Sequence, residues 1–214
     1  MRNVTVVGIQ WGDEGKGKIV DFFSENANAV VRFHGGHNAG HTVVADGQTY
    51  KTSIIPSGVI RGALGAIGNG CVLSPAQLES EIDQLRSGGI TVDPGNLMID
   101  ANTALVLPIH PAVDKAREEA AGKGQIGTTR KGIGPAYEDV AGRRALRTGD
   151  LLKSDSAIYD KAVAVCGHWN PVLRQHGADA FKPDDIVSYL SRYQDMTGAF
   201  VRHDVAPTLD TMQC

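Results

Sequence analysis

The feature that most constrains this chain is a glycine-rich segment that directly follows an apolar run near the N-terminus. Residues 4–9 (VTVVGI) are short, apolar and β-branched, a pattern typical of a strand buried on both faces of a sheet. Residues 12–18 (GDEGKGK) come next, and the apolar positions Ile19, Phe22 and Phe23 then indicate a helix. Helix N-termini present N–H groups to phosphate, and glycines let the backbone approach it closely. The sequence therefore predicts a phosphate loop at residues 12–18.

The spacing within this loop differs from the two common nucleotide-binding patterns. It is not G-x-x-x-x-G-K-[ST], because Lys18 is followed by Ile19, and it is not G-x-G-x-x-G. A tight strand-to-helix turn without a ligand is the alternative interpretation. Asp13 favours a chemical role, because a carboxylate repels phosphates unless a metal ion bridges them or the acid transfers a proton. We therefore expect catalysis at this loop.

A second strand candidate, residues 29–33, leads into another glycine-rich segment at residues 35–41 (GGHNAGH). Its histidines, His37 and His41, with His34 just before, allow three interpretations. A zinc site lacks a cysteine or carboxylate in the segment, and exposed histidines on a loop are the plain alternative. A histidine that faces a phosphate or developing oxyanion fits best, because imidazole can donate a hydrogen bond to negative charge.

The remaining pattern predicts the fold class. Ser74 as N-cap, Pro75 in the first helical position and Gln77 three residues after the cap predict a helix that residues 88–89 (GG) end. Other short apolar runs and helix candidates alternate along the chain, at residues 66–67, 72–73, 97–99, 104–107, 111–121 and 184–192. This alternation predicts an α/β fold with a mainly parallel sheet and flanking helices.

Residues 124–135 form a third glycine-rich segment that is too long for an idle turn and is a candidate binding loop. Its two threonines could surround a phosphate, or they could cap a turn. Guanidinium groups that match phosphate geometry follow at Arg143, Arg144 and Arg147. A solvated helix face is the alternative for these arginines.

Composition excludes several classes of function. The 214 residues contain 21 Lys+Arg and 24 Asp+Glu, a formal net charge of −3, which argues against a basic nucleic-acid-binding surface or a polybasic membrane patch. No apolar run reaches the ~18 to 20 residues of a membrane helix, so we expect a cytoplasmic protein with neither nucleic acid nor membrane as partner. Cys71, Cys166 and Cys214 show no metal-type or redox-type spacing, which indicates free thiols.

Five motifs in this chain resemble those of the adenylosuccinate synthetase family. They are residues 10–18 (QWGDEGKGK), 35–42 (GGHNAGHT), 55–58 (IPSG), 68–70 (GNG) and 126–139 (IGTTRKGIGPAYED). The resemblance covers residues 3–152 and fades after Leu152. It implies a cytoplasmic ligase, usually a homodimer, on a fold similar to that of phosphate-loop GTPases. The implied reaction joins L-aspartate to IMP through 6-phosphoryl-IMP, with GTP and one Mg²⁺ per subunit, in AMP biosynthesis.

The resemblance also implies roles for individual residues. Asp13 takes the proton from N1 of IMP and ligates Mg²⁺, His41 stabilises charge during phosphoryl transfer, and Gly40 offers its carbonyl to the metal. The implied GTP-binding residues are Gly12, Asp13, Glu14, Gly15, Lys16, Gly17, Lys18, Gly40, His41 and Thr42. The implied IMP-binding residues are Asp13, Glu14, Gly15, Lys16, Asn38, Ala39, Gly40, His41 and Thr129, with Arg143 reaching the IMP of the partner subunit.

Two departures from the family pattern set further expectations. His34 stands where the family commonly has glutamine. Family members are also much longer, so residues 1–152 are expected to be the N-terminal catalytic portion of the domain, and residues 153–214 a mainly helical continuation that is truncated. The segments for guanine recognition and aspartate binding are not found, so we expect a fragment or a truncated product. The alternatives are a non-catalytic module that binds IMP or nucleotide phosphate or pairs with another subunit, and a generic phosphate-loop NTPase.

Overall fold

The computed structural model describes residues 3–9, 15–45, 47–124 and 127–212. A parallel four-stranded sheet lies in the order β1-β4-β6-β8. Its strands are Ala29–Arg32, Leu64–Ile67, Leu97–Asp100 and Val201–Arg202. The predicted mainly parallel sheet is therefore confirmed, and the strand expected at residues 29–33 is β1. Two smaller pairs complete the strands, the antiparallel hairpin of β2 (His41–Ala45) with β3 (Gln48–Thr52) and the parallel pair of β5 (Val72–Leu73) with β7 (Ala104–Leu105).

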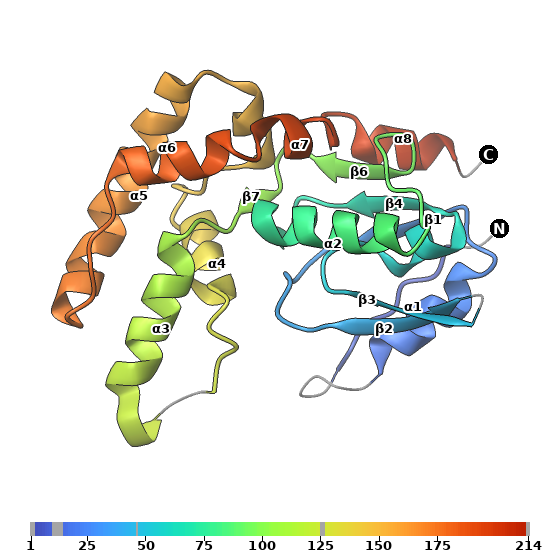
Figure 1. Cartoon of the computed structure of the whole chain (residues 1–214), viewed down its shortest axis with the longest axis horizontal. Coiled ribbons are helices and arrows are strands. Elements are labelled where there is room, and N and C mark those ends of the chain that lie inside the picture. The colour runs from blue at the N-terminus through green and yellow to red at the C-terminus, as the bar shows by residue number, and fades with distance from the viewer. Residues whose placement is uncertain (1–2, 10–14, 46, 125–126, 213–214) are drawn as a thin grey trace.

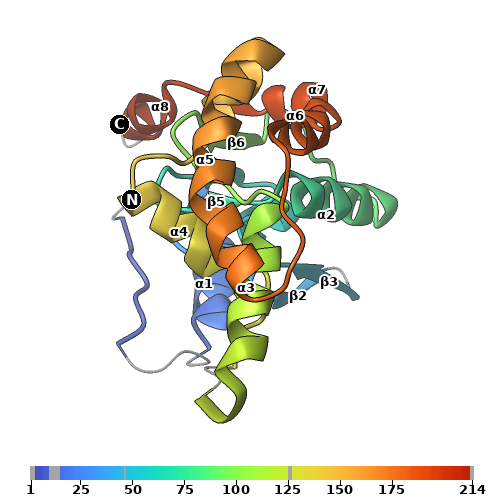
Figure 2. The ribbon, with the colours of Figure 1, turned by 90° about the vertical axis from the view of Figure 1, so that its left-hand side faces the viewer.

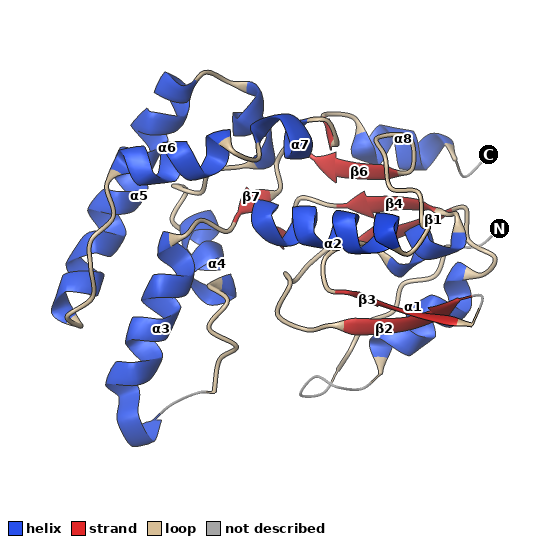
Figure 3. Ribbon diagram, in the orientation of Figure 1, coloured by secondary structure: helices blue, strands red, loops and turns tan. Residues whose placement is uncertain are grey.

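Helices flank these strands and dominate the second half of the chain (Figures 1 and 3). The α-helices are α1 (Lys16–Ser24), α2 (Pro75–Ser87), α3 (Ile109–Ala121), α4 (Ile133–Ala141), α5 (Asp155–Gln175), α6 (Pro183–Ser191), α7 (Gln194–Gly198) and α8 (Val205–Thr211). Short 3-10 helices are η1 (Ser57–Arg61), η2 (Gly122–Gly124) and η3 (Thr148–Leu152). None of the helices in the described part of the chain is long and apolar enough to cross a membrane.

Helix α2 begins and ends as its sequence predicts. The Ser74 side chain accepts a hydrogen bond from the Gln77 backbone N–H at 3.4 Å, and Pro75 occupies the first helical position. Gly88 is the C-cap, and Gly89 adopts φ 84, a backbone conformation that glycine accepts without steric cost. The buried face of α2, which includes Leu78, packs into the core beside the sheet and the hairpin.

The elements form two groups, and each group packs around its own apolar cluster. The largest cluster joins the hairpin, α2 and one face of the sheet, while α8 packs on Ala66 and Met98 at the other face. A second cluster joins α3, α5 and α6 around the buried Trp169. The two groups of elements stand side by side in Figure 1, and in Figure 2 the group of α3 and α5 faces the viewer; α4 with the β5–β7 pair lies where the groups meet. This junction is where the predicted loops gather.

The strand expected at residues 4–9 is wrong for this structure. Residues 3–9 contain no strand, and Val4, Val7 and Ile9 are 59%, 60% and 92% exposed. A β-branched run forms a strand only where a neighbouring strand completes its hydrogen bonds and covers its side chains. In the described sheet β1 pairs with β4 alone, and residues 4–9 do not pair with its other edge.

The third glycine-rich segment is only partly a loop. Residues 127–131 lie in irregular structure, but α4 starts at Ile133, so the end of the expected loop at residues 124–135 is helical. Gly132, with φ 75, is the N-cap that turns the loop into this helix. Cys71 and Cys166 are free, as expected, and both are buried, whereas Cys214 lies outside the described residues.

Candidate functional site

The first part of the candidate site is the N-terminus of α1. Gly15 is the N-cap, with φ 79, and its carbonyl accepts hydrogen bonds from the N–H groups of Lys18 and Ile19 at 2.9 and 3.3 Å. The first N–H groups of a helix have no partner within the helix and are available to an anion. Of the predicted loop, Gly15, Lys16, Gly17 and Lys18 are described, and Gly12, Asp13 and Glu14 lie outside the described residues.

The second part is His41, which opens β2 and packs directly on α1. A Cβ atom added to Gly17 would lie 2.8 Å from Cδ2 of His41, so only glycine allows the imidazole to approach so closely. Burial, together with the positive charges of Arg32 and Lys16, lowers the pKa of His41, and Glu81 opposes the shift. A neutral imidazole thus lies beside the helix N-terminus that the sequence predicted for phosphate.

The glycine-rich segment before His41 is fixed by one side chain from β1 and one from α4. Arg32 donates from Nη2 to the Gly36 carbonyl at 3.1 Å, and burial lowers the pKa of its guanidinium. Tyr137 of α4 accepts a hydrogen bond from the Gly35 N–H at 2.8 Å and donates one to the Gly70 carbonyl at 2.7 Å. The tip of this segment, residues 38–40, is exposed, as is Thr42. Its predicted IMP-binding and GTP-binding residues are therefore accessible.

Residues 127–132 approach the same segment from the other side. Lys131 donates from Nζ to the His37 carbonyl at 2.8 Å. The buried carboxylate of Asp114 on α3 accepts hydrogen bonds from the Thr128 hydroxyl and the Gly132 N–H, both at 3.0 Å. Thr129 is exposed between these tethers. The alternative of a capped turn thus describes Thr128, and Thr129 stays accessible to a ligand.

The three arginines after α4 have different surroundings. Arg144 donates from Nε to Asp139 at 2.6 Å, and Arg147 donates to the carbonyl of Asn102. Arg143 is exposed and adopts φ 58, a left-handed conformation that non-glycine residues rarely take. Arg144 and Arg147 therefore stabilise the fold, and Arg143 is the arginine of the three that projects from it.

Asp139 is the centre of a buried polar network that fixes α4 beneath this arginine turn. Its carboxylate accepts hydrogen bonds from His110 Nε2 at 2.9 Å and Trp169 Nε1 at 3.0 Å, in addition to that from Arg144. Burial opposes ionisation of Asp139, but these three partners outweigh it and lower the pKa of the carboxyl group. His110 is thus structural, because its imidazole joins the Leu107 N–H to the Asp139 carboxylate.

The structure also bears on the metal. Within the described residues there is no group of three or more His, Cys, Asp or Glu side chains that could hold a metal ion, which counts against the zinc interpretation of the histidines. Magnesium usually takes one or two carboxylates together with phosphates and water, and it requires no such cluster. Gly40 is exposed, with nothing within 4 Å of an added Cβ, and a backbone carbonyl oxygen is the hard oxygen donor that this chemistry uses. Asp13, the expected carboxylate, lies outside the described residues.

Sequence reasoning found the loops but missed the residues that join them. Tyr137 and Lys131 contact the glycine-rich segment across 102 and 94 residues of chain, and Asp114 contacts a loop 14 or more residues away. Tyr137 lies within a motif that carried the family resemblance, which was the available signal for it. The described parts of all three predicted loops meet around residues 35–41.

The chain matches known proteins along almost its whole length. A family model described as adenylosuccinate synthetase matches residues 5–213. A solved structure of a fully ligated adenylosuccinate synthetase from Plasmodium falciparum is similar with a TM-score of 0.80 and 28% sequence identity. The match covers 96% of this chain and 47% of that chain. This chain therefore spans about half the length of the solved relative.

Proposed function

Because the chain belongs to the adenylosuccinate synthetase family, a family of ligases of purine biosynthesis, we propose that it forms the phosphoryl-transfer portion of such an enzyme. The proposed reaction consumes GTP and joins L-aspartate to IMP. One observation carries the proposal: the neutral imidazole of His41 packs on Gly17 at the N-terminus of α1. Phosphoryl transfer requires positioning and charge stabilisation, and a helix N-terminus with an adjacent hydrogen-bond donor provides both.

The proposed roles follow the order of the reaction. Residues 12–18 and 40–42 bind the phosphates of GTP, and residues 13–16 and 38–41, with Thr129, line the IMP site. Asp13 removes the proton from N1 of IMP, so that O6 can attack the γ-phosphate. His41 donates a hydrogen bond to the phosphoryl oxygens as their charge changes. Arg143 reaches the IMP of a partner subunit in a homodimer.

Magnesium, when bound, would neutralise negative charge on the phosphoryl group that is transferred. Asp13 and the Gly40 carbonyl are the residues of this chain proposed to hold it. Carboxylate and carbonyl oxygens suit Mg²⁺, and Gly40 is exposed. Burial, together with the positive charges of Arg32 and Lys16, lowers the pKa of His41, so the imidazole stays a neutral donor.

The test is calorimetry of the 214-residue chain with GTP and with IMP, each with and without Mg²⁺, followed by an assay of adenylosuccinate formation. We expect the parent chain to bind nucleotide. His41→Asn and Asp13→Ala should weaken this binding or abolish product formation, and both variants should stay folded. In a catalytically complete form of the enzyme, His41→Asn should lower kcat more than it raises KM, because the imidazole acts in the transition state. Absence of binding to both GTP and IMP would contradict the proposal.

A second candidate is a nucleotide-binding module without turnover. The residues proposed for the site in this chain are assigned to phosphate, metal and IMP and none of them to guanine or aspartate, and the match covers 47% of the solved relative. The two candidates differ in one measurement. Binding of IMP or GTP by the isolated chain without adenylosuccinate formation supports the module, and turnover at the rate of a full-length family member supports a self-sufficient enzyme.

A further inference from the structure

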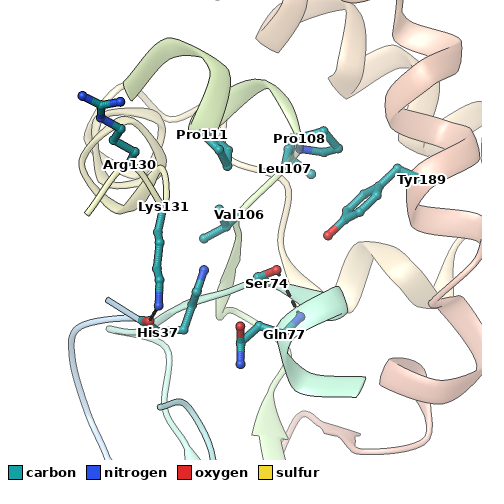
Figure 4. Close-up of a pocket in the computed structure, with 10 residues that line it drawn as sticks. All are labelled: His37, Ser74, Gln77, Val106, Leu107, Pro108, Pro111, Arg130, Lys131 and Tyr189. Carbon is teal, nitrogen blue, oxygen red and sulfur yellow. Dashed lines mark hydrogen bonds between the residues drawn. The ribbon is translucent and has the colours of Figure 1, made fainter. Parts of the chain in front are cut away.

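A hollow lies beside the proposed site and contains none of the residues assigned to that site. It is a cavity of about 280 Å³ bounded by the N-termini of α2 and α3, residues 130–131 and helix α6 (Figure 4). It shares a wall with the glycine-rich segment through His37, the neighbour of Asn38. The predicted IMP-binding residues thus lie next to the cavity and do not line it.

The polar wall of this cavity contains an unpaired buried imidazole. His37 is 7% exposed, and its Nδ1 has no hydrogen-bond partner among the described residues. Its ring points into the hollow between Val106 and Ser74 in Figure 4. Burial, together with the charges of Lys131 and Arg32, lowers the pKa of His37 to about 4, against the opposing charge of Glu81. A buried polar group without a hydrogen-bond partner is destabilising in the free protein. A ligand that forms a hydrogen bond with Nδ1 of His37 would remove this cost.

Hydroxyl and amide groups accompany the imidazole. Ser74, Gln77 and Tyr189 also line the cavity, and the Tyr189 hydroxyl points toward the start of α2 (Figure 4). The Ser74 hydroxyl and the Ala76 backbone interact with this phenol, while burial raises its pKa. The phenol is thus protonated at neutral pH and can donate. These groups are the kind that bind the oxygen atoms of an anion.

One cationic side chain, that of Lys131, lies at the edge of the cavity. Lys131 donates to the His37 carbonyl, a neutral acceptor, and forms no ion pair with any residue in the described ranges. Arg130 also borders the cavity, but its side chain points away from the other lining residues in Figure 4 and lies 3.7 Å from Glu119. The positive charge at the cavity is therefore that of Lys131.

The opposite wall is apolar. It is formed by Val106, Leu107 and Pro108, with Pro111 of α3 beside them. Val106 and Leu107 are buried. A ligand that fills this space therefore needs a compact apolar portion as well as a polar end, the usual combination in small-molecule sites.

We propose that this cavity binds a small organic oxyanion, a phosphate or carboxylate carried on a compact apolar group. The anionic end lies near Lys131, His37 and the hydroxyls, and the apolar group lies against Val106 and Leu107. The site is independent of the proposed GTP and IMP sites, because it uses different side chains.

The first test is calorimetry of the 214-residue chain with phenyl phosphate and with benzoate, and with benzyl alcohol as the neutral comparison. At least one anion should bind, and the neutral alcohol should bind at least ten times more weakly. Lys131→Met should weaken anion binding at least tenfold, and Lys115→Met, an exposed lysine on α3 outside the cavity, should not. Whichever anion binds more tightly identifies the phosphate or carboxylate class. Equal anion affinity of the Lys131→Met and Lys115→Met variants would overturn the proposal.

A second variant separates a binding role from a structural one. His37→Leu removes the unpaired nitrogen, so it should abolish anion binding while raising the Tm of the free chain by about 2 to 4 °C. A structural histidine would instead give a lower Tm. Unchanged binding in this variant overturns the proposal.

The last comparison distinguishes the cavity from the phosphate loop. Lys16→Met should leave binding of the anion at the cavity unchanged and weaken GTP. If Lys16→Met abolishes anion binding and Lys131→Met does not, the anion occupies the phosphate loop, which overturns this inference and leaves the proposed function standing. If GTP and IMP fail to bind while Lys131→Met still weakens anion binding, the proposed function is overturned and the cavity inference stands.

Discussion

At the scale of single residues, Gly17 determines whether His41 can reach the helix N-terminus. Gly17→Ala places a methyl group 2.8 Å from the imidazole, so the ring must move. Alanine favours helix over glycine by about 1 kcal/mol, so the variant should fold at least as stably as the parent. We therefore expect unchanged or higher Tm with GTP affinity lowered at least tenfold, measured by calorimetry. Gly167→Ala is the matched control, because this exposed glycine in α5 has nothing within 4 Å of an added Cβ.

Protonation of His37 predicts a dependence of stability on pH. The pKa of His37 in the folded chain is about 4, below its ordinary value of 6.5, so the unfolded chain takes up the proton first as the pH falls. The free energy of unfolding is therefore highest above pH 6.5, where the imidazole is neutral in both states, and it declines as the pH falls from there toward pH 4. Between pH 6.5 and 5.5 the free energy of unfolding should fall by about 1 kcal/mol, because the unfolded histidine is already half protonated at pH 6.5. Urea unfolding measures this, and His37→Leu should flatten the slope, whereas His203→Leu, at an exposed position, should not.

At the scale of elements, α3 positions the loop of residues 127–132. Asp114→Asn leaves an amide that can satisfy only one of the two donors, the Thr128 hydroxyl and the Gly132 N–H. The loss of a buried hydrogen bond should cost about 1 to 3 kcal/mol. Because the same loop contains Thr129, the affinity for IMP should fall as well, which calorimetry measures. Asp155→Asn, at the start of α5, is a control carboxylate far along the chain from this loop. Equal IMP affinity in the two variants would show that Asp114 does not position Thr129.

The elements also show where sequence reasoning succeeds and where it stops. Local signals were sufficient for α2, because its N-cap, its proline and its terminal glycines act within a few residues of one another. They failed for residues 4–9, because burial of a strand depends on a partner that no local pattern specifies. The same reasoning applies to the site. The glycine-rich loops were evident from sequence, but the bonds of Tyr137 and Lys131 to them cross about a hundred residues and required the fold.

At the scale of the molecule, exposed apolar side chains concentrate near the N-terminus. Nine of the twelve large hydrophobic residues found exposed among the described positions lie between residues 4 and 44. They include Phe22 and Phe23 of α1 and Val31 of β1, a strand whose outer edge no described strand pairs with. Parallel sheets are ordinarily covered on both faces. The similar solved chain is about twice as long by coverage, so its architecture includes further polypeptide with no counterpart in these residues.

This exposure predicts how the isolated 214-residue chain behaves in solution. Apolar side chains left in water bind hydrophobic dyes and promote association. We expect strong fluorescence enhancement with anilinonaphthalene sulfonate and concentration-dependent self-association in sedimentation. The double variant Val7→Thr with Phe22→Ser should reduce both, and its Tm should stay within about 2 °C, because these side chains are 60% and 67% exposed and contribute little packing. Val163→Thr, at an exposed position in α5, should change neither measurement. If the double variant associates as strongly as the parent, the N-terminal apolar side chains are not what drives association.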